Sequence, residues 1–419
     1  MIRIGRWWVR LGALVSTTMA LAGAMTGCAA PSDDLLLDGT EEIEEAALAE
    51  LAFERARLGA RWLAADVREN GAFYYTYRPA RDAYEEDDYN EIRHAGTTYA
   101  LFQVYGAVGG EELLGAGERA AGYIDDHSQD VEGSGRAFVY EDTSKLGGQA
   151  LALVALLERR RVTKDTSYDE LIDDLATFLL SMEIESEPGR YYQSYDAAND
   201  QRLLEPASDY YPGEALLALT RLAQQFPEEP YLEAATRAAD YLVYERDGDI
   251  PAADQIPRED QWLAMALSDL YRLNQEQDYA TVAYLQAGSM IGNQYTADDR
   301  YPMRIGASRT RNPVNYTSTA TKGEALDAVW GLAIFLEDEE RIEPLATAAR
   351  RNVQFQMRVQ YTEENAQLFP RPERMIGAWG QDAAEPYVRM DFVQHNISAL
   401  IGVWHLTEEG DVPVAEPIT

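Results

Sequence analysis

The sequence contains a single cysteine, Cys28, among its 419 residues. One thiol cannot form a disulfide within the chain, and it excludes metal sites built from pairs of cysteines. Lysine is also scarce, because only Lys145, Lys164 and Lys322 occur and arginine supplies the rest of the 36 basic residues. Against 72 acidic residues the formal net charge is −36, which argues against nucleic acid or an anionic membrane surface as a partner, since both bind basic surfaces.

The remaining composition fits a large folded protein. Hydrophobic residues make up 46% and aromatic residues 10% of the chain, which excludes global disorder. The acidic surface mainly favours solubility. At about 150 residues per domain the length suggests two or three domains, although closed repeat folds often exceed that size.

The N-terminus has the pattern of a secretory signal. Arg3, Arg6 and Arg10 form a basic start, residues 11–22 are mostly apolar, and small residues precede Cys28. The apolar stretch is too short, and too often interrupted by Gly and Thr, for a convincing membrane span. We therefore expect residues 1–27 to be a signal peptide.

The segment Met25-Thr26-Gly27-Cys28 resembles a bacterial lipoprotein lipobox, with Met in place of the usual Leu at the first position. The resemblance implies cleavage before Cys28 and lipid on its sulfur and new amino group, and several acyl chains on one residue anchor a protein stably. It implies a bacterial cell-envelope protein, sent to the outer membrane if the organism is Gram-negative, with residues 28–40 as a tether. The alternative is an ordinary secretory signal with a chance cysteine.

Apolar residues recurring with a helical period predict about twelve helices in the rest of the chain. The expected ranges are 41–66, 91–106, 111–127, 144–160, 167–183, 212–225, 229–245, 258–274, 277–294, 318–336, 339–358 and 391–406. Some, such as 148–157 and 323–335, are apolar nearly all round, which indicates burial on every side. Others, such as 111–127 and 339–358, carry a charged stripe and are expected to lie outside.

The two kinds of helix alternate, and so do their connections. A short turn follows each expected inner helix, whereas a long loop follows each outer one, so the helices pair as antiparallel hairpins with all long loops at one end. Small residues also recur where inner helices open, at Gly96, Gly148, Gly213 and Gly323. Six such pairs with a buried inner set favour closure into an all-α (α/α)6 toroid over residues 41–406, followed by a tail at 407–419.

In this pattern the chain resembles the six-hairpin glycosidase-like superfamily, which includes glycoside hydrolases, polysaccharide lyases and sugar epimerases. The resemblance rests on the repeat architecture, and no single catalytic signature is matched. It implies a site in the funnel at the N-terminal ends of the inner helices, where helix dipoles converge and the long loops gather.

Carboxylates precede or open several inner helices, as glycoside hydrolysis requires of a pair flanking the scissile bond. We favour Asp209 or Glu214 paired with Glu259 or Asp260, and Glu324 and Asp391 are further candidates at substrate-binding positions. The alternative for each acid is structural: a helix N-cap or a charge that complements the helix dipole.

Two of the four histidines also lie near the start of an expected inner helix. His94 is a candidate general acid or base, and His395 with Asn396 a candidate sugar contact, although buried structural histidines are an equal alternative. His127 and His405 fall near helix ends and fit a dipole role. No HExxH spacing occurs, so neither a metal site nor a cofactor is expected.

Aromatic residues and cations complete the expected mouth. Segments 73–77 and 191–195 alternate like short strands of β-hairpins in the long loops. Tyr210, Tyr211 and Trp379 could stack on sugar rings, or pack the loops onto the ring. The cations Arg93, Arg258, Lys322 and Arg389 would suit an anionic substrate, unless they pair with nearby acids.

Together these features predict a lipid-anchored envelope protein that processes a carbohydrate, most simply as a glycoside hydrolase, on an anionic glycan if the cations are free. A second hypothesis is a uronate lyase or epimerase in which Tyr210, Tyr211 or His94 moves a proton while Arg93 or Arg389 neutralises the carboxylate. A third is a non-catalytic lipoprotein that binds a glycan or a protein during envelope assembly or polysaccharide export.

Overall fold

The computed structural model describes residues 43–246, 250–297, 300–411 and 413, and these contain twelve α-helices of two kinds. The inner helices are α3 (Glu91–Val108), α5 (Leu146–Thr163), α7 (Tyr211–Gln225), α9 (Gln261–Asn274), α11 (Tyr316–Phe335) and α13 (Met390–Glu408). The outer helices are α2 (Glu45–Asp66), α4 (Glu111–Asp126), α6 (Asp169–Ser181), α8 (Tyr231–Asp240), α10 (Gln277–Gly292) and α12 (Glu339–Val359). The predicted ranges agree with these bounds to within a few residues.

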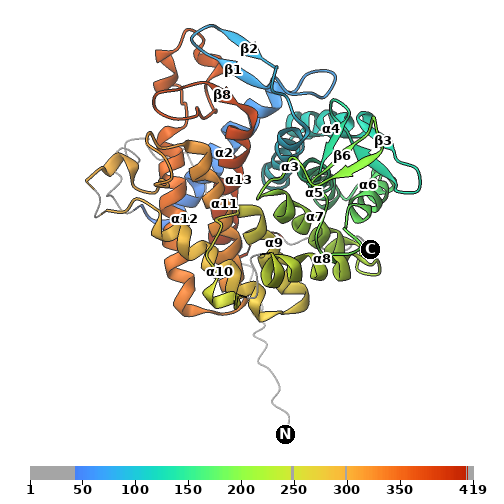
Figure 1. Ribbon diagram of the computed structural model, residues 1–419. Coiled ribbons are helices and arrows are strands. Elements are labelled where there is room, and N and C mark those ends of the chain that lie inside the picture. The colour runs from blue at the N-terminus through green and yellow to red at the C-terminus, as the bar shows by residue number, and fades with distance from the viewer. Residues whose placement is uncertain (1–42, 247–249, 298–299, 412, 414–419) are drawn as a thin grey trace, which may run out of the picture. The chain divides into compact units, whose positions relative to one another are not determined.

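The inner helices form a closed circle. Each packs against the next along the chain, and α13 packs against α3, which closes the ring (Figure 1). The outer helices α4, α6, α8, α10 and α12 each pack on the inner helix that precedes them, and α2 packs on α13. An open solenoid would leave its first and last inner helices apart, so the predicted (α/α)6 toroid is confirmed.

Burial follows the sequence pattern that separates the two kinds of helix. In α5 every residue from Leu146 to Arg160 is buried, as expected for a helix surrounded by other helices. In α4 the buried residues recur every three or four positions, from Leu113 through Ala116 and Ala120 to Ile124. The outer helices therefore cover the ring with one apolar face and leave the charged face in solvent.

Side-chain caps fix where three inner helices begin. Asn90 accepts a hydrogen bond from the backbone N–H of Arg93, and Asn315 accepts one from Ser318. Asp260 accepts from the N–H groups of Trp262 and Leu263. These caps lie at the end of the ring that also carries the long loops, so they help to fix the geometry of that end.

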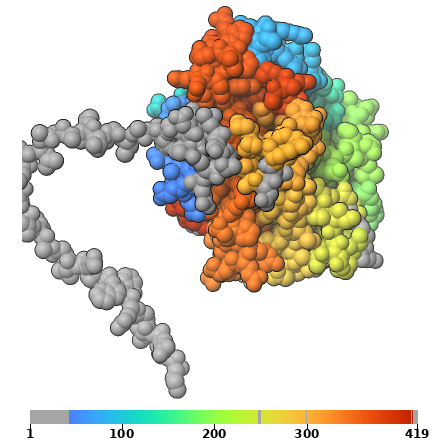
Figure 2. Space-filling view, turned by 90° about the vertical axis from the view of Figure 1, so that its left-hand side faces the viewer, coloured from blue at the N-terminus to red at the C-terminus, as the bar shows by residue number. Residues whose placement is uncertain are grey.

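Three small sheets stiffen the long loops. Strand β1 (Thr76–Arg78) pairs with β2 (Ala83–Glu85) and with β8 (Val388–Arg389), which joins the loops before α3 and α13. In Figure 2 the orange-red segment before α13 accordingly lies beside the light-blue β1–β2 segment. Strand β6 (Ser194–Asp196) pairs with β5 (Thr143–Lys145) and β7 (Gln201–Leu203), and β3 (Ser128–Asp130) with β4 (Arg136–Phe138).

The predicted hairpins are present, but their strands begin later than expected. At the predicted starts, Phe73 and Tyr191 form isolated bridges with Val67 and Glu183 at the ends of the preceding outer helices. The predicted signal peptide, Cys28 and the tether fall outside the described residues. Among the helices that are described, none is long and apolar enough to cross a membrane.

Candidate functional site

The N-terminal ends of the inner helices surround a cavity of about 520 Å³, which we call the mouth cavity. All six inner helices, or the residues immediately before them, contribute to its wall. Its lining side chains include Arg93, Leu151, Tyr210, Glu214, Gln261, Trp262, Arg311, Lys322, Gln381, Arg389, Asp391, Phe392, Gln394 and His395. The ring therefore gathers polar residues from distant parts of the sequence into one place.

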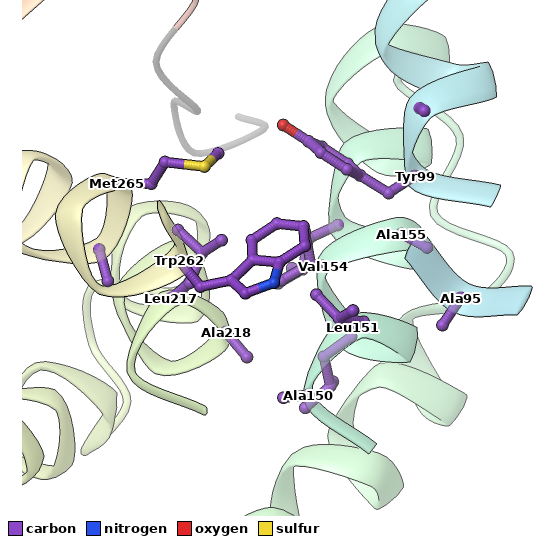
Figure 3. Close-up of a cluster of buried hydrophobic side chains, with 14 of the residues drawn as sticks. Ala95, Tyr99, Ala150, Leu151, Val154, Ala155, Leu217, Ala218, Trp262 and Met265 are labelled. Carbon is purple, nitrogen blue, oxygen red and sulfur yellow. The ribbon is translucent and has the colours of Figure 1, made fainter. Parts of the chain in front are cut away.

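A cluster of buried hydrophobic side chains, part of which Figure 3 shows, borders the mouth cavity. Leu151 of α5 and Trp262 of α9 line the cavity and belong to a buried cluster that also contains Val154. Tyr99 and Met265, in the same cluster, line a second and smaller cavity of about 60 Å³ further inside the ring. The hydrophobic cluster therefore contributes side chains to both cavities.

His395 is held by a buried carboxylate. Its Nδ1 lies 2.7 Å from Oε2 of Glu324, whose side chain is buried on α11. A carboxylate accepts, so Nδ1 carries the proton, and Nε2 has no hydrogen-bond partner within the described chain. Burial works to lower the pKa of His395, but the charge and hydrogen bond of Glu324 outweigh it and the pKa is raised. The pair thus presents an oriented imidazole to the cavity.

Glu214 faces the same cavity from α7. Its side chain is buried, and its Oε2 has no hydrogen-bond partner in the described structure. Gly147 makes room for it, because a Cβ at that position would lie 2.0 Å from this oxygen. Desolvation, reinforced by Asp260, raises the pKa of Glu214 well above its ordinary value. Burial thus favours the protonated form of Glu214, which is the form that can donate a proton.

Asp260 is buried behind Glu214, at the start of α9. Its Oδ1 caps the helix, and its Oδ2 has no hydrogen-bond partner in the described structure and lies against Gly213. Desolvation raises the pKa of Asp260 to about 7, despite the backbone hydrogen bonds that favour its charged form. Glu214 and Asp260 are thus two neighbouring acids, both with raised pKa values.

A cluster of one acid and two arginines forms the opposite wall. Asp391 accepts from Arg389 at 2.5 and 2.8 Å and from Arg93 at 3.1 Å. Although burial works to raise the pKa of Asp391, the arginines lower it, so this carboxylate stays ionised. The hydroxyl of Tyr75 accepts a further hydrogen bond from Arg93.

Lys322 reaches the cavity from α11. Its Nζ donates to the backbone oxygen of Glu259 at 2.8 Å and lies 3.5 Å from that residue's Oε2. Burial lowers the pKa of Lys322, and the Glu259 carboxylate opposes this effect. Glu259 itself turns toward the outer helix α10, where Ser289 and Asn293 donate to it. Lys322 therefore lines the mouth, whereas Glu259 supports it from behind.

The structure places several predicted candidates away from the cavity, and their proposed roles require correction. His94 is fully buried between Tyr89 and the backbone oxygen of Ala120 on α4, and burial lowers its pKa to about 3. It follows Arg93 directly, and since consecutive helical residues point in different directions, only Arg93 faces the mouth. His94 is thus a structural residue between an inner and an outer helix.

Trp379 is also enclosed. Its indole is fully buried, and Nε1 donates to the backbone oxygen of Gln356, so no face is available to a sugar. Asn396 is buried and donates to Phe392 within its own helix. The tryptophan that does line the mouth is Trp262, in the first turn of α9, and Tyr210 and Phe392 are further aromatic residues of the wall.

The other candidates lie near the rim or behind the wall. Asp209 is exposed and ion-paired with Arg258 at 3.0 Å, which leaves it outside the cavity. Tyr210 lines the cavity and is about half-exposed, whereas Tyr211 packs against Gly147. Glu324 lies behind His395 and lines the smaller cavity.

Sequence reasoning missed the loop residues of the wall. Arg311 and Gln381 come from the loops before α11 and α13, and Gln261 and Gln394 from the first turns of α9 and α13. An Arg-rich loop was the only available signal for Arg311. No group of three or more histidine, cysteine, aspartate or glutamate side chains that could hold a metal ion occurs among the described residues.

Comparison with known proteins finds no matching family model and no matching curated protein. Solved structures do match. Cellobiose 2-epimerase from Bacillus thermoamylovorans B4167 is 14% identical, with a TM-score of 0.63 over 84% of this chain and 98% of its own. D-mannose isomerase is 13% identical, with a TM-score of 0.62 over 87% and 99%. An unsaturated glucuronyl hydrolase specific for heparin is 11% identical, with a TM-score of 0.58 over 87% and 99%. The chain thus has the six-hairpin glycosidase-like fold that its repeat pattern predicts.

Proposed function

We propose that the protein is a carbohydrate-processing enzyme whose reaction takes place in the mouth cavity. The cavity combines apolar side chains such as Trp262 and Leu151 with amide and hydroxyl groups and with the titratable Glu214, Lys322 and His395, which is the kind of site that binds and turns over a sugar. The neighbours in fold are named as sugar epimerase, sugar isomerase and glucuronyl hydrolase, which supports the same class of substrate.

The observation that supports one chemistry over the others is that the imidazole of His395 lies between a buried carboxylate and the cavity. Glu324 fixes its orientation and leaves Nε2 as the acceptor that faces the substrate. A histidine positioned in this way is a general base for a carbon-bound proton next to a carbonyl group. We therefore favour sugar isomerisation or epimerisation.

The step can be written with its protons and electrons. His395 Nε2 takes the proton from C2 of an open-chain aldose, and the electrons of that C–H bond form a C1–C2 double bond while O1 becomes negative. Lys322, the ammonium on the wall, stabilises this oxygen. Return of the proton from His395 to C1, with transfer of the O2 proton to O1, gives the ketose. Donation of a proton from the carboxyl group of Glu214 to the opposite face of C2, with return of the electrons to the C1 carbonyl, gives the epimer.

The test is proton exchange in heavy water. Purified protein is incubated with aldoses in D₂O, and loss of the C2 proton signal is followed by NMR. We expect exchange that falls about 10²- to 10⁴-fold in His395→Asn, and that falls in Glu324→Gln as well. His127→Gln, which changes a histidine outside the cavity, is the matched control. Undiminished exchange in His395→Asn would refute this role.

Hydrolysis is the second candidate, and the neighbouring pair of Glu214 and Asp260 is the observation that favours it. Glu214 is a suitable general acid, and its neighbour Asp260, once ionised, would act as the general base. Release of nitrophenol from nitrophenyl glycosides tests this reaction. Loss of release in Glu214→Gln and Asp260→Asn, with release retained in His395→Asn, would decide for hydrolysis. A protein that binds sugars and catalyses neither reaction would be a binding lipoprotein.

We also propose that the mature chain is anchored to the bacterial envelope by lipid on Cys28, on the sequence pattern alone. Mass spectrometry of the expressed protein tests this proposal. We expect cleavage before Cys28 and a mass increase from acyl chains, both absent in Cys28→Ser.

A further inference from the structure

The mouth cavity has the opposite charge balance to the chain as a whole. Among the described residues that line it, four are cations, Arg93, Arg311, Lys322 and Arg389, and two are acids. The complete chain has 36 basic and 72 acidic residues. Charged residues of one sign concentrated in a cleft attract ligands of the opposite sign.

The acids of the wall cancel only part of this charge. Burial raises the pKa of Glu214 well above its ordinary value, which favours the uncharged form of this acid. Asp391 is ionised, but it faces two guanidinium groups, so the cluster of Arg93, Asp391 and Arg389 retains one net positive charge. Lys322 is balanced by Glu259.

The two arginines also retain unused donors. Arg93 donates from Nε to Asp391 and from Nη1 to Tyr75. Arg389 donates from Nε and Nη2 to Asp391. Nη2 of Arg93 and Nη1 of Arg389 have no hydrogen-bond acceptor in the described structure. Both side chains remain partly exposed, at 32% and 23%. Asp391 thus holds two guanidinium groups in place while each keeps an N–H edge for a ligand.

This cluster lies close to the imidazole. Asp391 and His395 are four residues apart on α13, so they share one face of the helix with about 5–6 Å between their Cβ atoms. An anionic group bound by the arginines at one end of a sugar would therefore leave the other end of the same sugar unit beside His395. That separation matches a single sugar unit with an acidic group at one end.

We propose that the mouth cavity selects sugars that carry an oxyanion, with a uronic acid carboxylate or a sugar phosphate seated on Arg93 and Arg389. Charge-assisted hydrogen bonds from guanidinium to carboxylate or phosphate supply the affinity, and Arg311 adds charge at the loop side. This inference rests on the proposed function, because it names the substrate class of the same site.

Calorimetric titration of the full chain tests the inference without requiring turnover. The probes are D-glucuronate, D-galacturonate and glucose 6-phosphate, with D-glucose and D-mannose as their neutral counterparts. We expect the anionic sugars to bind at least tenfold more tightly than the neutral sugars at low salt, and the advantage to shrink as salt rises. Tighter binding of uronates identifies a carboxylate site, and tighter binding of the phosphate identifies a phosphate site.

Variants separate this subsite from general charge. Arg93→Gln should lower the affinity for anionic sugars at least tenfold more than it lowers the affinity for neutral sugars. Arg57→Gln, on the outer helix α2 beside Glu54, removes the same charge far from the cavity and should change neither. If Arg93→Gln fails to fold, Arg311→Gln in the exposed loop replaces it, with an expected loss of about threefold.

The outcomes that would overturn the inference are distinct from those that would overturn the proposed function. Equal affinity for neutral and anionic sugars, or proton exchange on neutral sugars alone, removes the anion subsite and leaves the enzyme. If none of the sugars binds, both the anion subsite and the proposed function are refuted. An anion preference that persists unchanged in Arg93→Gln and in Arg311→Gln also overturns the assignment.

Discussion

Replacing Asp260 by Asn should make the protein more stable at alkaline pH than the wild type. In the folded state the pKa of Asp260 is about 7, because desolvation penalises its charge, whereas the ordinary aspartate value is 3.8. A raised folded-state pKa means that the stabilising contribution is complete below pH 3.8 and is lost as pH rises through 7. Each unit of difference between the two pKa values lowers the free energy of unfolding by about 1.4 kcal/mol, so the total loss is roughly 4 kcal/mol.

Asparagine keeps the other role of this residue. Its side-chain oxygen can still accept from the N–H groups of Trp262 and Leu263, because aspartate and asparagine are comparable helix caps. The substitution therefore removes the titration while it preserves the start of α9.

Urea unfolding at several pH values measures the effect as the difference in unfolding free energy between Asp260→Asn and wild type. We expect this difference to shift in favour of the variant by about 4 kcal/mol between pH 4 and pH 8.5, with most of the change below pH 7. Asp209→Asn, at an exposed carboxylate near the rim, is the control and should give a nearly constant difference. A constant difference for Asp260→Asn, or a shift in favour of the wild type, would refute the argument from burial.

Three further results are expected. Gly147→Ala should destabilise the protein by about 1–3 kcal/mol in thermal unfolding, because the added Cβ meets Glu214 at 2.0 Å; an unchanged melting temperature would contradict this packing. Asp327→Asn should stabilise the protein at pH 8 in urea unfolding, because burial raises the pKa of Asp327 and both its oxygens lack partners in the described structure; a destabilised variant would argue against that. In an NMR titration the imidazole of His94, with a pKa of about 3, should stay neutral down to pH 5, and that of His395 should titrate above pH 6.5; the reverse order would disprove the two environments.

The architecture could be predicted from the sequence because the signals that define it are local. A helix such as α5, apolar from Leu146 onward, has to be buried on all sides, and a striped helix such as α4 has to be buried on one. Alternation of the two kinds, with short and long connections in turn, leaves few arrangements besides a ring. The end of the ring that carries the polar residues follows from the loop lengths alone.

The site could be predicted only in part, because direction and pairing are not local. Arg93 and His94 are adjacent and equally polar, yet one faces the cavity and the other an outer helix. The hydrogen bond between Glu324 and His395 joins residues 71 positions apart, and no spacing in the sequence indicates it. Asp209 lies just before α7 and Glu214 in its first turn, yet the first forms an exposed ion pair and the second is a buried acid.

A crystal structure of the protein with glucuronate bound tests the central claim most directly. The account predicts the sugar in the mouth cavity, its carboxylate on Arg93 and Arg389, and its C2 within about 3.5 Å of Nε2 of His395. A sugar bound elsewhere on the ring, with the mouth cavity holding only water, would contradict it.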